Sequence, residues 1–301
     1  MPILSLQNVV KRYHNHVAVN NTSFDVPKGS IFGLLGPNGA GKTSLIRIIT
    51  TITGADEGTI LLDGEPLNLE HPKDIGYMPE ERGLYKKMKV GEQLLYLAQL
   101  KGLSKADAKK NLKYWLEKFE IGSWWDKKIE ELSKGMQQKI QFIATVVHDP
   151  KLLILDEPFS GLDPINTNLI KDEIYELNQK GKSIIFSTHR MEQVEEICEE
   201  IVLINKGNKI LQGKVAQIKE DHKENVFELQ FEGSLPSGFA NSTFDILDDT
   251  DDKLLIKINE GHNSNELLLN IINAGIHLKS YREVLPTLNQ IFIKHVGSSD
   301  E

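Results

Sequence analysis

A glycine-rich stretch in the first quarter of the chain indicates chemistry most directly. The pattern G-x-x-x-x-G-K-[ST] is matched in full by consecutive residues, which are Gly36, Pro37, Asn38, Gly39, Ala40, Gly41, Lys42 and Thr43. Glycines let the backbone N–H groups of such a loop turn toward phosphate oxygens, and a helix that begins there adds positive partial charge. Lys42 is then expected to reach the β- and γ-phosphates of a nucleotide, and Thr43 to offer its hydroxyl to Mg²⁺. The alternative, a purely structural glycine-rich turn, is disfavoured by the strand-like run before the loop and the helical pattern after it.

Two adjacent acids and a histidine each follow a short apolar run. Asp156 and Glu157 come directly after Leu152–Leu155, and His189 comes soon after Ile184–Ser187. Buried parallel strands deliver such residues at their carboxyl ends, where ligands bind. Asp156 is expected to hold Mg²⁺ directly or through water, and Glu157 to accept a proton from the attacking water. An isolated acid pair is more typical of helix capping and a lone histidine of a packed turn, so only their combination with the phosphate loop favours catalysis, with His189 contacting the γ-phosphate.

The hydrophobic pattern predicts the elements that must position these residues. Residues 2–30 are expected to form short strands, with breaks at Asn20-Asn21 and at Pro27-Lys28-Gly29. A helix is expected to begin near Lys42, and residues 90–147 have a helical pattern. Parallel strands joined by crossover helices are predicted by the apolar runs Ile31–Leu35, Leu152–Leu155, Ile184–Ser187 and Ile201–Ile204.

The pattern changes near residues 213–223, which indicates a second domain. Strict alternation over 227–232 and again over 254–258 predicts strands with one buried face. Further elements are expected as a helix over 265–274, a strand over 276–283 and a helix over 286–295. Four acids between two of these strands, Asp248, Asp249, Asp251 and Asp252, are interpreted as a solvated hairpin turn rather than a calcium site. We therefore expect a nucleotide-binding domain at 1–215 and a small α+β accessory domain at 222–301.

The composition of the 301-residue chain is that of a globular protein, with 40% hydrophobic and 26% charged residues. A formal net charge of −8 gives no help to non-specific binding of nucleic acid or of an anionic bilayer, and no nucleic-acid partner is expected. The single cysteine, Cys198, is interpreted as a packed residue in a reducing compartment. The N-terminus does not have the pattern of a secretory signal, and no apolar run reaches the ~18 residues that a spanning helix needs. A role at a membrane would therefore depend on a partner protein.

The order and spacing of the motifs resemble those of the ABC transporter ATPase family. The resemblance covers residues 1 to about 215 and rests on GPNGAGKTS at 36–44, ELSKGMQQK at 131–139, LLILDEP at 152–158, SGLD at 160–163 and STH at 187–189. The segment ELSKGMQQK in particular separates this family from other P-loop enzymes. The resemblance implies an α/β P-loop NTPase fold with a mixed sheet, an antiparallel β subdomain and a helical subdomain. It also implies ATP and Mg²⁺ as cofactors, a second ATPase subunit in a homodimer, and an integral-membrane permease beneath which the chain lies at the cytoplasmic face of the cell membrane.

Further site residues are implied by this resemblance alone. Tyr13 would stack on adenine, and Ser44 would complete the phosphate loop. Glu80 occupies a position usually held by glutamine and would lie near Mg²⁺ and the nucleotide. The remaining implied residues are Ser133 and Gly135, which would bind the γ-phosphate of ATP held by the opposite subunit, and Asp163 in the loop after the catalytic acid. The alternatives are that Tyr13 is only a strand-face aromatic and that Ser133 is only a helix cap.

Residues 76–85, GYMPEERGLY, together with the extra C-terminal domain resemble the branch that contains bacterial sodium-efflux and drug-efflux ATPases, which implies export. Two other classes of function are compatible with a phosphate loop. A soluble ATP-dependent switch acting on ribosomes or DNA usually has two cassettes or long coiled-coil insertions, and this sequence has neither. A P-loop kinase would transfer phosphate to an acceptor rather than release it.

Overall fold

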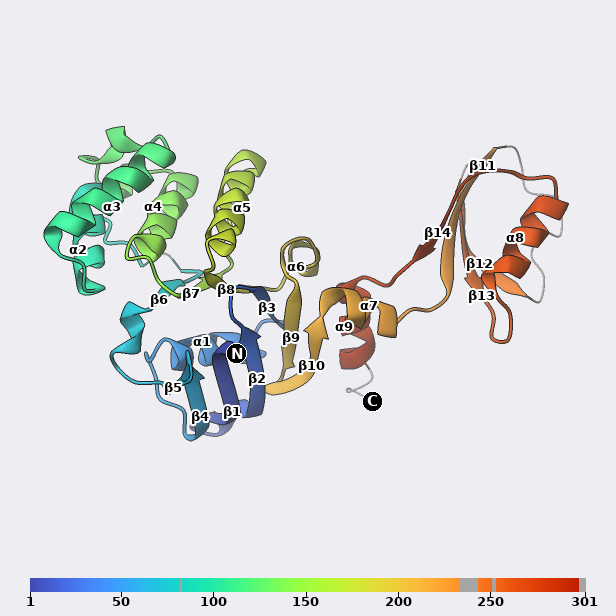
Figure 1. Cartoon of the computed structure of the whole chain (residues 1–301), viewed down its shortest axis with the longest axis horizontal. Helices are drawn as coiled ribbons and strands as arrows, with labels where there is room; N and C mark the ends of the chain where they lie inside the picture. The colour runs from blue at the N-terminus through green and yellow to red at the C-terminus, as the bar shows by residue number, and fades with distance from the viewer. Residues whose placement is uncertain (82, 233–242, 251–252, 298–301) are drawn as a thin grey trace. The chain divides into compact units, whose positions relative to one another are not determined.

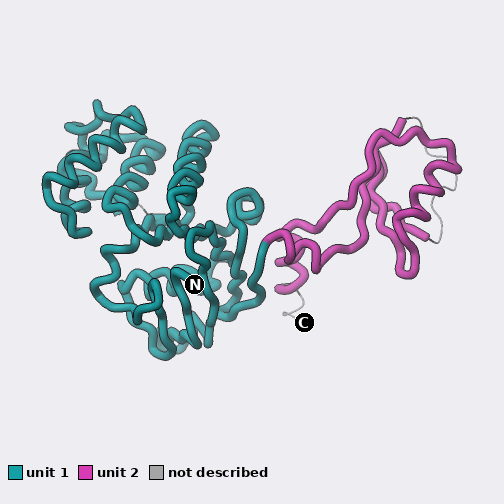
Figure 2. The backbone as a smooth tube through the Cα atoms, in the orientation of Figure 1, with its two compact units in different colours: residues 1–214 teal, residues 215–301 magenta. Residues whose placement is uncertain are grey.

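The computed structural model describes residues 1–81, 83–232, 243–250 and 253–297. Within them the chain folds as two compact units, residues 1–214 and 215–301 (Figure 2). The second unit takes in residues 216–221, which the sequence-based boundaries leave between the two domains, and residue 215, which they place in the first. No helix of the described residues is long and apolar enough to cross a membrane.

The first unit begins with an antiparallel sheet of order β2-β1-β4-β5 (Figure 1). Its strands are β1 (Pro2–Tyr13), β2 (His16–Pro27), β4 (Glu57–Leu62) and β5 (Glu65–Pro66). The predicted break at Asn20-Asn21 is wrong, because β2 continues through both residues. The register moves from Val9↔Thr22 to Lys11↔Val19, so these two asparagines oppose one residue of β1 in a β-bulge, and Asn21 has a φ of 48°. The break after Pro27 is confirmed, since β2 ends there.

A second, largely parallel sheet of order β10-β9-β3-β8-β7-β6 positions the motifs. Its strands are β3 (Ile31–Leu35), β6 (Ile75–Met78), β7 (Leu152–Asp156), β8 (Ser183–Thr188), β9 (Glu200–Asn205) and β10 (Asn208–Lys214). The predicted parallel strands are confirmed: β3 pairs in parallel with β8 and β9, and β7 with β6 and β8, whereas β10 runs antiparallel at the edge. Every residue of β3, β7 and β8 is buried, as continuous apolar runs require.

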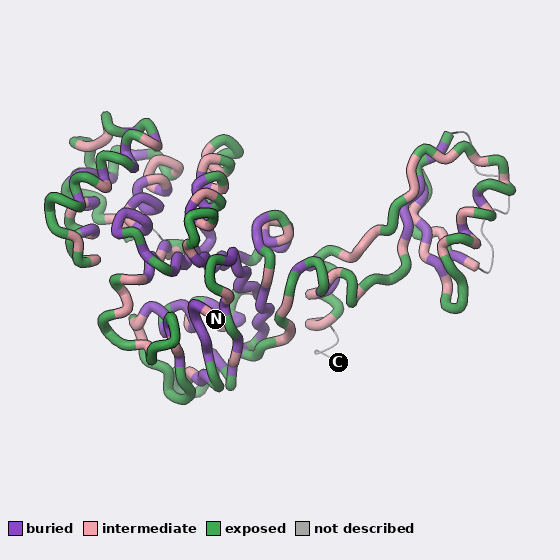
Figure 3. The backbone as a smooth tube through the Cα atoms, in the orientation of Figure 1, coloured by how far each residue is buried: buried purple, intermediate pink, exposed green. Residues whose placement is uncertain are grey.

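The helices of this unit alternate along the chain with the strands of the second sheet. Their bounds are α1 (Lys42–Ile49), α2 (Val90–Leu100), α3 (Lys105–Lys118), α4 (Lys134–Val146), α5 (Pro164–Gln179) and α6 (Met191–Ile197), with 3₁₀ turns at His71–Lys73, Gly122–Trp124 and Ile129–Glu131. The apolar face of α1 packs in a core that both sheets share. Helices α2, α3 and α4 form one group in Figure 1, and α4 also packs against β6. Buried residues are concentrated in the two sheets and on the facing sides of these helices (Figure 3).

The second unit is a small α+β fold, as its alternating pattern predicts. Its elements are α7 (Val215–Asp221), β11 (Val226–Glu232), β12 (Phe244–Thr250), β13 (Lys253–Ile258), α8 (Ser264–Asn273), β14 (His277–Val284) and α9 (Leu288–Gly297). The antiparallel sheet of order β12-β13-β11-β14 buries alternate residues of β11 and β13 against α8. Asp248 and Asp249 are exposed residues of β12 rather than part of the predicted turn, and Asp251 and Asp252 lie outside the described residues. No group of His, Cys, Asp or Glu suited to a metal ion occurs among the described residues.

Candidate nucleotide-binding site

The loop between β3 and α1 has a backbone that glycine alone fits well. Gly36, Gly39 and Gly41 have φ values of 151°, 80° and 108°, which L-residues with side chains rarely adopt. A Cβ on Gly36 would lie 2.2 Å from the Ile204 carbonyl oxygen, and one on Gly41 would lie 2.3 Å from the Ala18 carbonyl oxygen. The loop therefore passes close to two neighbouring backbones and enters α1 at Lys42, with Asn38 and Gly39 exposed at its tip.

Lys42 lies folded over this loop. Its Nζ donates hydrogen bonds to the carbonyl oxygens of Gly36 at 2.6 Å and Pro37 at 3.1 Å. Burial lowers the pKa of Lys42, and the nearby carboxylates of Asp156 and Glu157 oppose that effect. Of the neighbouring predicted residues, Ala40 is buried, Ser44 is half-buried and Thr43 is exposed. The ammonium group is thus placed between the loop and the acids, within the charge field of both.

Asp156 is the last residue of β7 and faces β8. Because the parallel register pairs Asp156 with Ser187, the serine Oγ reaches the carboxylate and donates a hydrogen bond of 2.7 Å to Oδ1. Burial raises the pKa of Asp156; the Ser187 hydrogen bond acts against this, whereas Glu157 and Glu80 add to it. A buried carboxylate of this kind is stabilised as an anion by a neighbouring cation. The oxygen donors Asp156, Thr43 and Glu80 suit Mg²⁺, which takes few protein ligands and keeps waters or substrate phosphates.

Glu157 is held by the segment that follows β8. Its Oε1 accepts hydrogen bonds from the backbone N–H of His189 at 2.8 Å and from His189 Nδ1 at 2.6 Å, and its Oε2 accepts one from Thr188 Oγ1 at 3.0 Å. The Glu157 backbone has a φ of 49°, a left-handed conformation that costs about 1–2 kcal/mol for an L-residue. The predicted acid and histidine are therefore in direct contact, and the strained backbone aims the carboxylate at His189.

The predicted residues outside this cluster have simpler surroundings. Tyr13 ends β1 with 36% of its surface exposed and lies under Lys11 Nζ, 5.5 Å from the ring centroid. Glu80 is exposed, and its neighbour Arg82 lies outside the described residues. The Glu80 carboxylate is close enough to affect the pKa of Asp156, which brings it to the edge of the cluster.

Ser133, Gly135 and Asp163 lie at the starts of two helices. Ser133 is the N-cap of α4 and its Oγ accepts from the Met136 N–H at 3.3 Å; Asp163 is the N-cap of α5 and accepts from the Asn166 N–H at 2.9 Å. Hydrogen bonds from the backbone N–H and the side-chain amide of Asn166 lower the pKa of Asp163. Among the hydrogen bonds of the described residues, none joins Ser133, Gly135 or Asp163 to the phosphate loop of the same chain. The capping alternative for Ser133 therefore describes its local contact correctly, and the residue is also exposed to solvent.

Sequence reasoning missed the two hydroxyl side chains that hold the acids. Ser187 and Thr188 lie within the STH segment, of which His189 alone was singled out. The usable signal was that both precede His189 at the end of a predicted strand adjacent to Leu152–Leu155. Residues at the ends of adjacent parallel strands meet at one edge of the sheet, so short hydroxyl side chains there are natural partners for the acids.

Comparison with known proteins agrees with this geometry. The family model "ABC transporter" matches residues 19–160, and the model of the C-terminal domain of DrrA1-3-like ATP-binding proteins matches residues 213–296. The chain is 44% identical over 298 residues to YhaQ of Bacillus subtilis, an uncharacterised ABC transporter ATP-binding protein, covering 98% of this chain and 99% of that one. It is 37% identical to the linearmycin resistance ATP-binding protein LnrL of Bacillus subtilis, covering 70% of this chain and 69% of that one. A solved ATP-binding subunit of an ABC transporter superimposes with a TM-score of 0.68 at 29% identity, over 73% of this chain and 92% of that one.

These matches extend over both compact units and include relatives of nearly the same length. They agree with the phosphate loop, the acid pair and the histidine that β3, β7 and β8 bring together. The chain belongs to the family of ABC transporter ATP-binding subunits and is an ATPase.

Proposed function

We propose that two copies of this chain close around two Mg-ATP molecules, and that hydrolysis reopens them and drives a separate integral-membrane permease in export. ABC ATP-binding subunits dimerise and work with membrane permeases. One observation supports the pairing of two copies. Ser133 begins α4 at an exposed helix start of the kind that suits an anion, and within the described residues this helix start has no hydrogen bond to the chain's own phosphate loop. A phosphate held by a second copy is the partner that suits this helix start.

Within each proposed site the residues have distinct roles. The loop of residues 36–41 and Lys42 bind the phosphates, and Tyr13 stacks on adenine. Thr43, Asp156 and Glu80 would hold Mg²⁺, which supplies charge neutralisation for the phosphates when bound. Glu157 accepts a proton from the attacking water, and Ser44, Gly135 and Asp163 complete the nucleotide interface. His189 changes partner, because the Nδ1–H now donated to Glu157 is the group that would be offered to a γ-phosphate oxygen.

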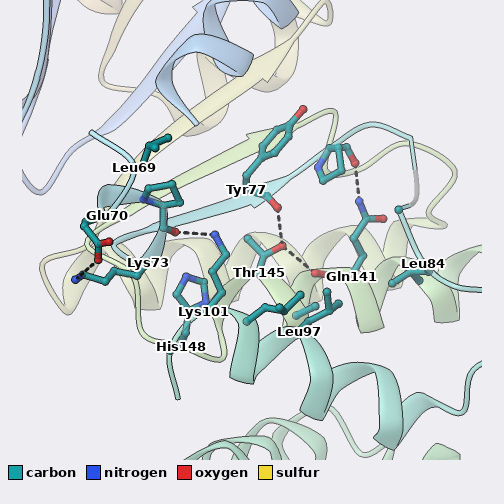
Figure 4. A pocket seen from close by; sticks show the side chains of 16 residues that line it. Leu69, Glu70, Lys73, Tyr77, Leu84, Leu97, Lys101, Gln141, Thr145 and His148 are labelled. Carbon is teal, nitrogen blue, oxygen red and sulfur yellow. Dashed lines mark hydrogen bonds and ion pairs between the residues drawn. The ribbon is translucent and has the colours of Figure 1, made fainter. Parts of the chain in front are cut away.

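We further propose that the permease docks in a pocket between β6 and α4, which we call the β6–α4 pocket (Figure 4). Its cavity volume is about 510 Å³. Apolar side chains line most of it, including Leu69, Leu84, Leu97 and Leu100, and Leu69 and Leu100 are 83% and 65% exposed. An apolar pocket with an exposed rim beside the segment of Glu80 is suited to a partner that must sense the nucleotide.

The polar groups of the β6–α4 pocket specify the chemistry of the docking segment. Burial lowers the pKa of His148 to about 4, so its imidazole is neutral near neutral pH. Its Nε2 lies 3.3 Å from the Ile75 carbonyl oxygen, which makes Nε2 the donor and leaves Nδ1 an acceptor. Within the described part of the chain, His148 Nδ1 and Gln141 Oε1 are buried without a hydrogen-bond partner, while Gln141 Nε2 donates to the Pro79 carbonyl oxygen at 2.6 Å. The permease segment is therefore proposed to insert an apolar side chain together with hydroxyl or N–H donors.

Export is proposed from the relatives. LnrL is a linearmycin resistance ATP-binding protein, and the second unit of this chain matches the DrrA1-3-like C-terminal domain. The chain would then lie at the cytoplasmic face of the cell membrane, held there by its permease. No nucleic-acid partner is proposed, in keeping with a net charge of −8.

The dimer proposal is tested with a Glu157→Gln protein saturated with Mg-ATP, by light scattering after size exclusion. We expect a dimer that is absent without nucleotide. Adding Ser133→Ala should weaken this dimer, whereas adding Ser104→Ala should not, although both serines cap helices of the same region in the same way. A Glu157→Gln protein that stays monomeric under these conditions contradicts the proposal.

The permease proposal is tested by purifying the tagged chain from a detergent extract of its own cells and identifying the associated proteins by mass spectrometry. An integral membrane protein is expected, and ribosomal proteins in its place would contradict the proposal. Leu100→Asp at the pocket rim should abolish co-purification, while Tyr114→Asp, at a similarly exposed site on α3 away from the pocket, should not.

A further inference from the structure

The two carboxylate oxygens of Glu157 are held unequally. Both donors to Oε1 belong to His189, whose side chain is 49% exposed. The donor to Oε2 is Thr188 Oγ1 at 3.0 Å, and Thr188 is fully buried at the end of β8. Oε1 is therefore held by a half-exposed imidazole and by a backbone N–H, whereas Oε2 is held by a side chain fixed in the sheet.

The position of Thr188 is itself well determined. In the parallel register of β3 and β8 it pairs with Leu35, the residue directly before the phosphate loop. Its Oγ1 accepts a hydrogen bond from the Arg190 N–H at 3.1 Å while it donates to Glu157. A hydroxyl has one proton to donate, so this arrangement commits that proton to the carboxylate.

From this asymmetry we propose that Thr188 is a positioning residue for Glu157. It keeps Oε2 fixed through the catalytic cycle while the His189 imidazole leaves Oε1 and opens that oxygen to the attacking water. The inference rests on the proposed role of Glu157 as the proton acceptor. When the His189 imidazole turns to a γ-phosphate, the carboxylate keeps the bond from the His189 backbone N–H on Oε1 and the bond from Thr188 on Oε2, and the Thr188 bond is the one anchored in β8. Without the Thr188 bond, the backbone N–H on Oε1 is the one of these three bonds that remains. The carboxylate can then turn about its terminal torsion, and water in front of Oε1 meets a proton acceptor of variable direction.

The test compares Thr188→Val, which keeps the shape and removes the hydroxyl, with Thr188→Ser, which keeps the hydroxyl. Hydrogen bonds to charged groups contribute enough to predict a fall of about 10- to 100-fold in kcat for Thr188→Val, with KM for ATP changed by less than about twofold. Thr188→Ser should recover most of the lost turnover. Thr188→Ala removes the hydroxyl with a smaller side chain, and it replaces Thr188→Val if the valine variant does not fold.

Two results would overturn the inference. Wild-type kcat in both Thr188→Val and Thr188→Ala would show that the hydroxyl is dispensable, and a serine variant as slow as the valine variant would show that shape alone matters. A cycle with Glu157→Gln separates this inference from the proposed function. If Thr188 acts through Glu157, adding Thr188→Val to Glu157→Gln lowers the residual turnover no further. If Glu157→Gln itself turns over at the wild-type rate, it is the proposed role of Glu157 that fails.

Discussion

Removing the hydroxyl of Ser187 tests the electrostatics of the acid edge most directly. Ser187 is fully buried, Asp156 is 6% exposed, and their hydrogen bond of 2.7 Å joins a hydroxyl to a carboxylate. Such charge-assisted bonds contribute about 1.5–3 kcal/mol, against about 0.5–1.5 kcal/mol for neutral ones. We therefore expect Ser187→Ala to lower the free energy of unfolding by about 1.5–3 kcal/mol near neutral pH.

The pH dependence of this loss has a definite sign. Burial already raises the pKa of Asp156 above its ordinary 3.8, and the Ser187 bond lowers it, so the variant raises this pKa further. A raised pKa in the folded state means that the contribution of Asp156 to stability is present below the unfolded pKa and is lost as the pH rises through the folded pKa. The difference in free energy of unfolding between wild type and Ser187→Ala should therefore grow as the pH rises through the folded pKa of Asp156. It should shrink as the pH falls below that pKa, because the hydrogen bond is charge-assisted when the carboxylate is ionised.

A second serine on the same strand provides the control. Ser183 is 1% exposed at the other end of β8, and its Oγ accepts a neutral hydrogen bond of 2.8 Å from the Gly29 N–H. Ser183→Ala should cost about 0.5–1.5 kcal/mol at every pH. Denaturant unfolding at neutral pH and at mildly acidic pH measures both losses, and the acid side of the ATPase pH profile should move to higher pH for Ser187→Ala alone. A Ser187→Ala loss that does not change with pH would refute this account of Asp156.

Three further variants have defined outcomes. Gly41→Ala should abolish ATP binding measured by nucleotide fluorescence, because the new Cβ would lie 2.3 Å from the Ala18 carbonyl oxygen at a φ of 108°. The control Gly54→Ala should bind ATP normally, since no atom lies within 4 Å of its Cβ. Equal affinities of the two variants would contradict the clash. Glu80→Gln should retain ATP binding and alter turnover and Mg²⁺ dependence, since it removes a charge that acts on the buried acid of β7; unchanged values of both would exclude a direct role for Glu80. Glu228→Gln should lower the melting temperature at neutral pH but not in acid. Hydrogen bonds from basic side chains on β13 and β14 hold the pKa of Glu228 below 4.5, so the stability that Glu228 contributes is lost as the pH falls through that lowered pKa. A loss of stability that does not depend on pH would count against these bonds.

The sequence allowed the frame of the site to be predicted, because its signals are local. Continuous apolar runs at Ile31–Leu35, Leu152–Leu155 and Ile184–Ser187 encode strands buried on both faces, and these became β3, β7 and β8. Because parallel strands end at a common edge, the phosphate loop, the acids and His189 had to lie near one another. The positions of Asp156 and His189 at this edge followed from that reasoning.

What the sequence could not provide depends on register and packing. The turn preference of Asn20-Asn21 is overridden by pairing with β1 on either side, which absorbs the extra residue as a bulge. The contacts of Ser187 and Thr188 with the acids depend on how β7 is aligned with β8, and no periodic pattern records that alignment. The unpartnered Nδ1 of His148 likewise depends on how α4 packs against β6.

The hydrogen bonds of Lys42 to the loop have a consequence for the cycle of binding and release. The ammonium group of Lys42 donates to the carbonyl oxygens of Gly36 and Pro37, and these two bonds tie the start of the phosphate loop to the first residue of α1. A nucleotide must displace these two bonds, and only one with phosphates long enough to reach Nζ replaces them. A monophosphate would not make that replacement, so the position of Lys42 favours nucleotides with a longer phosphate chain.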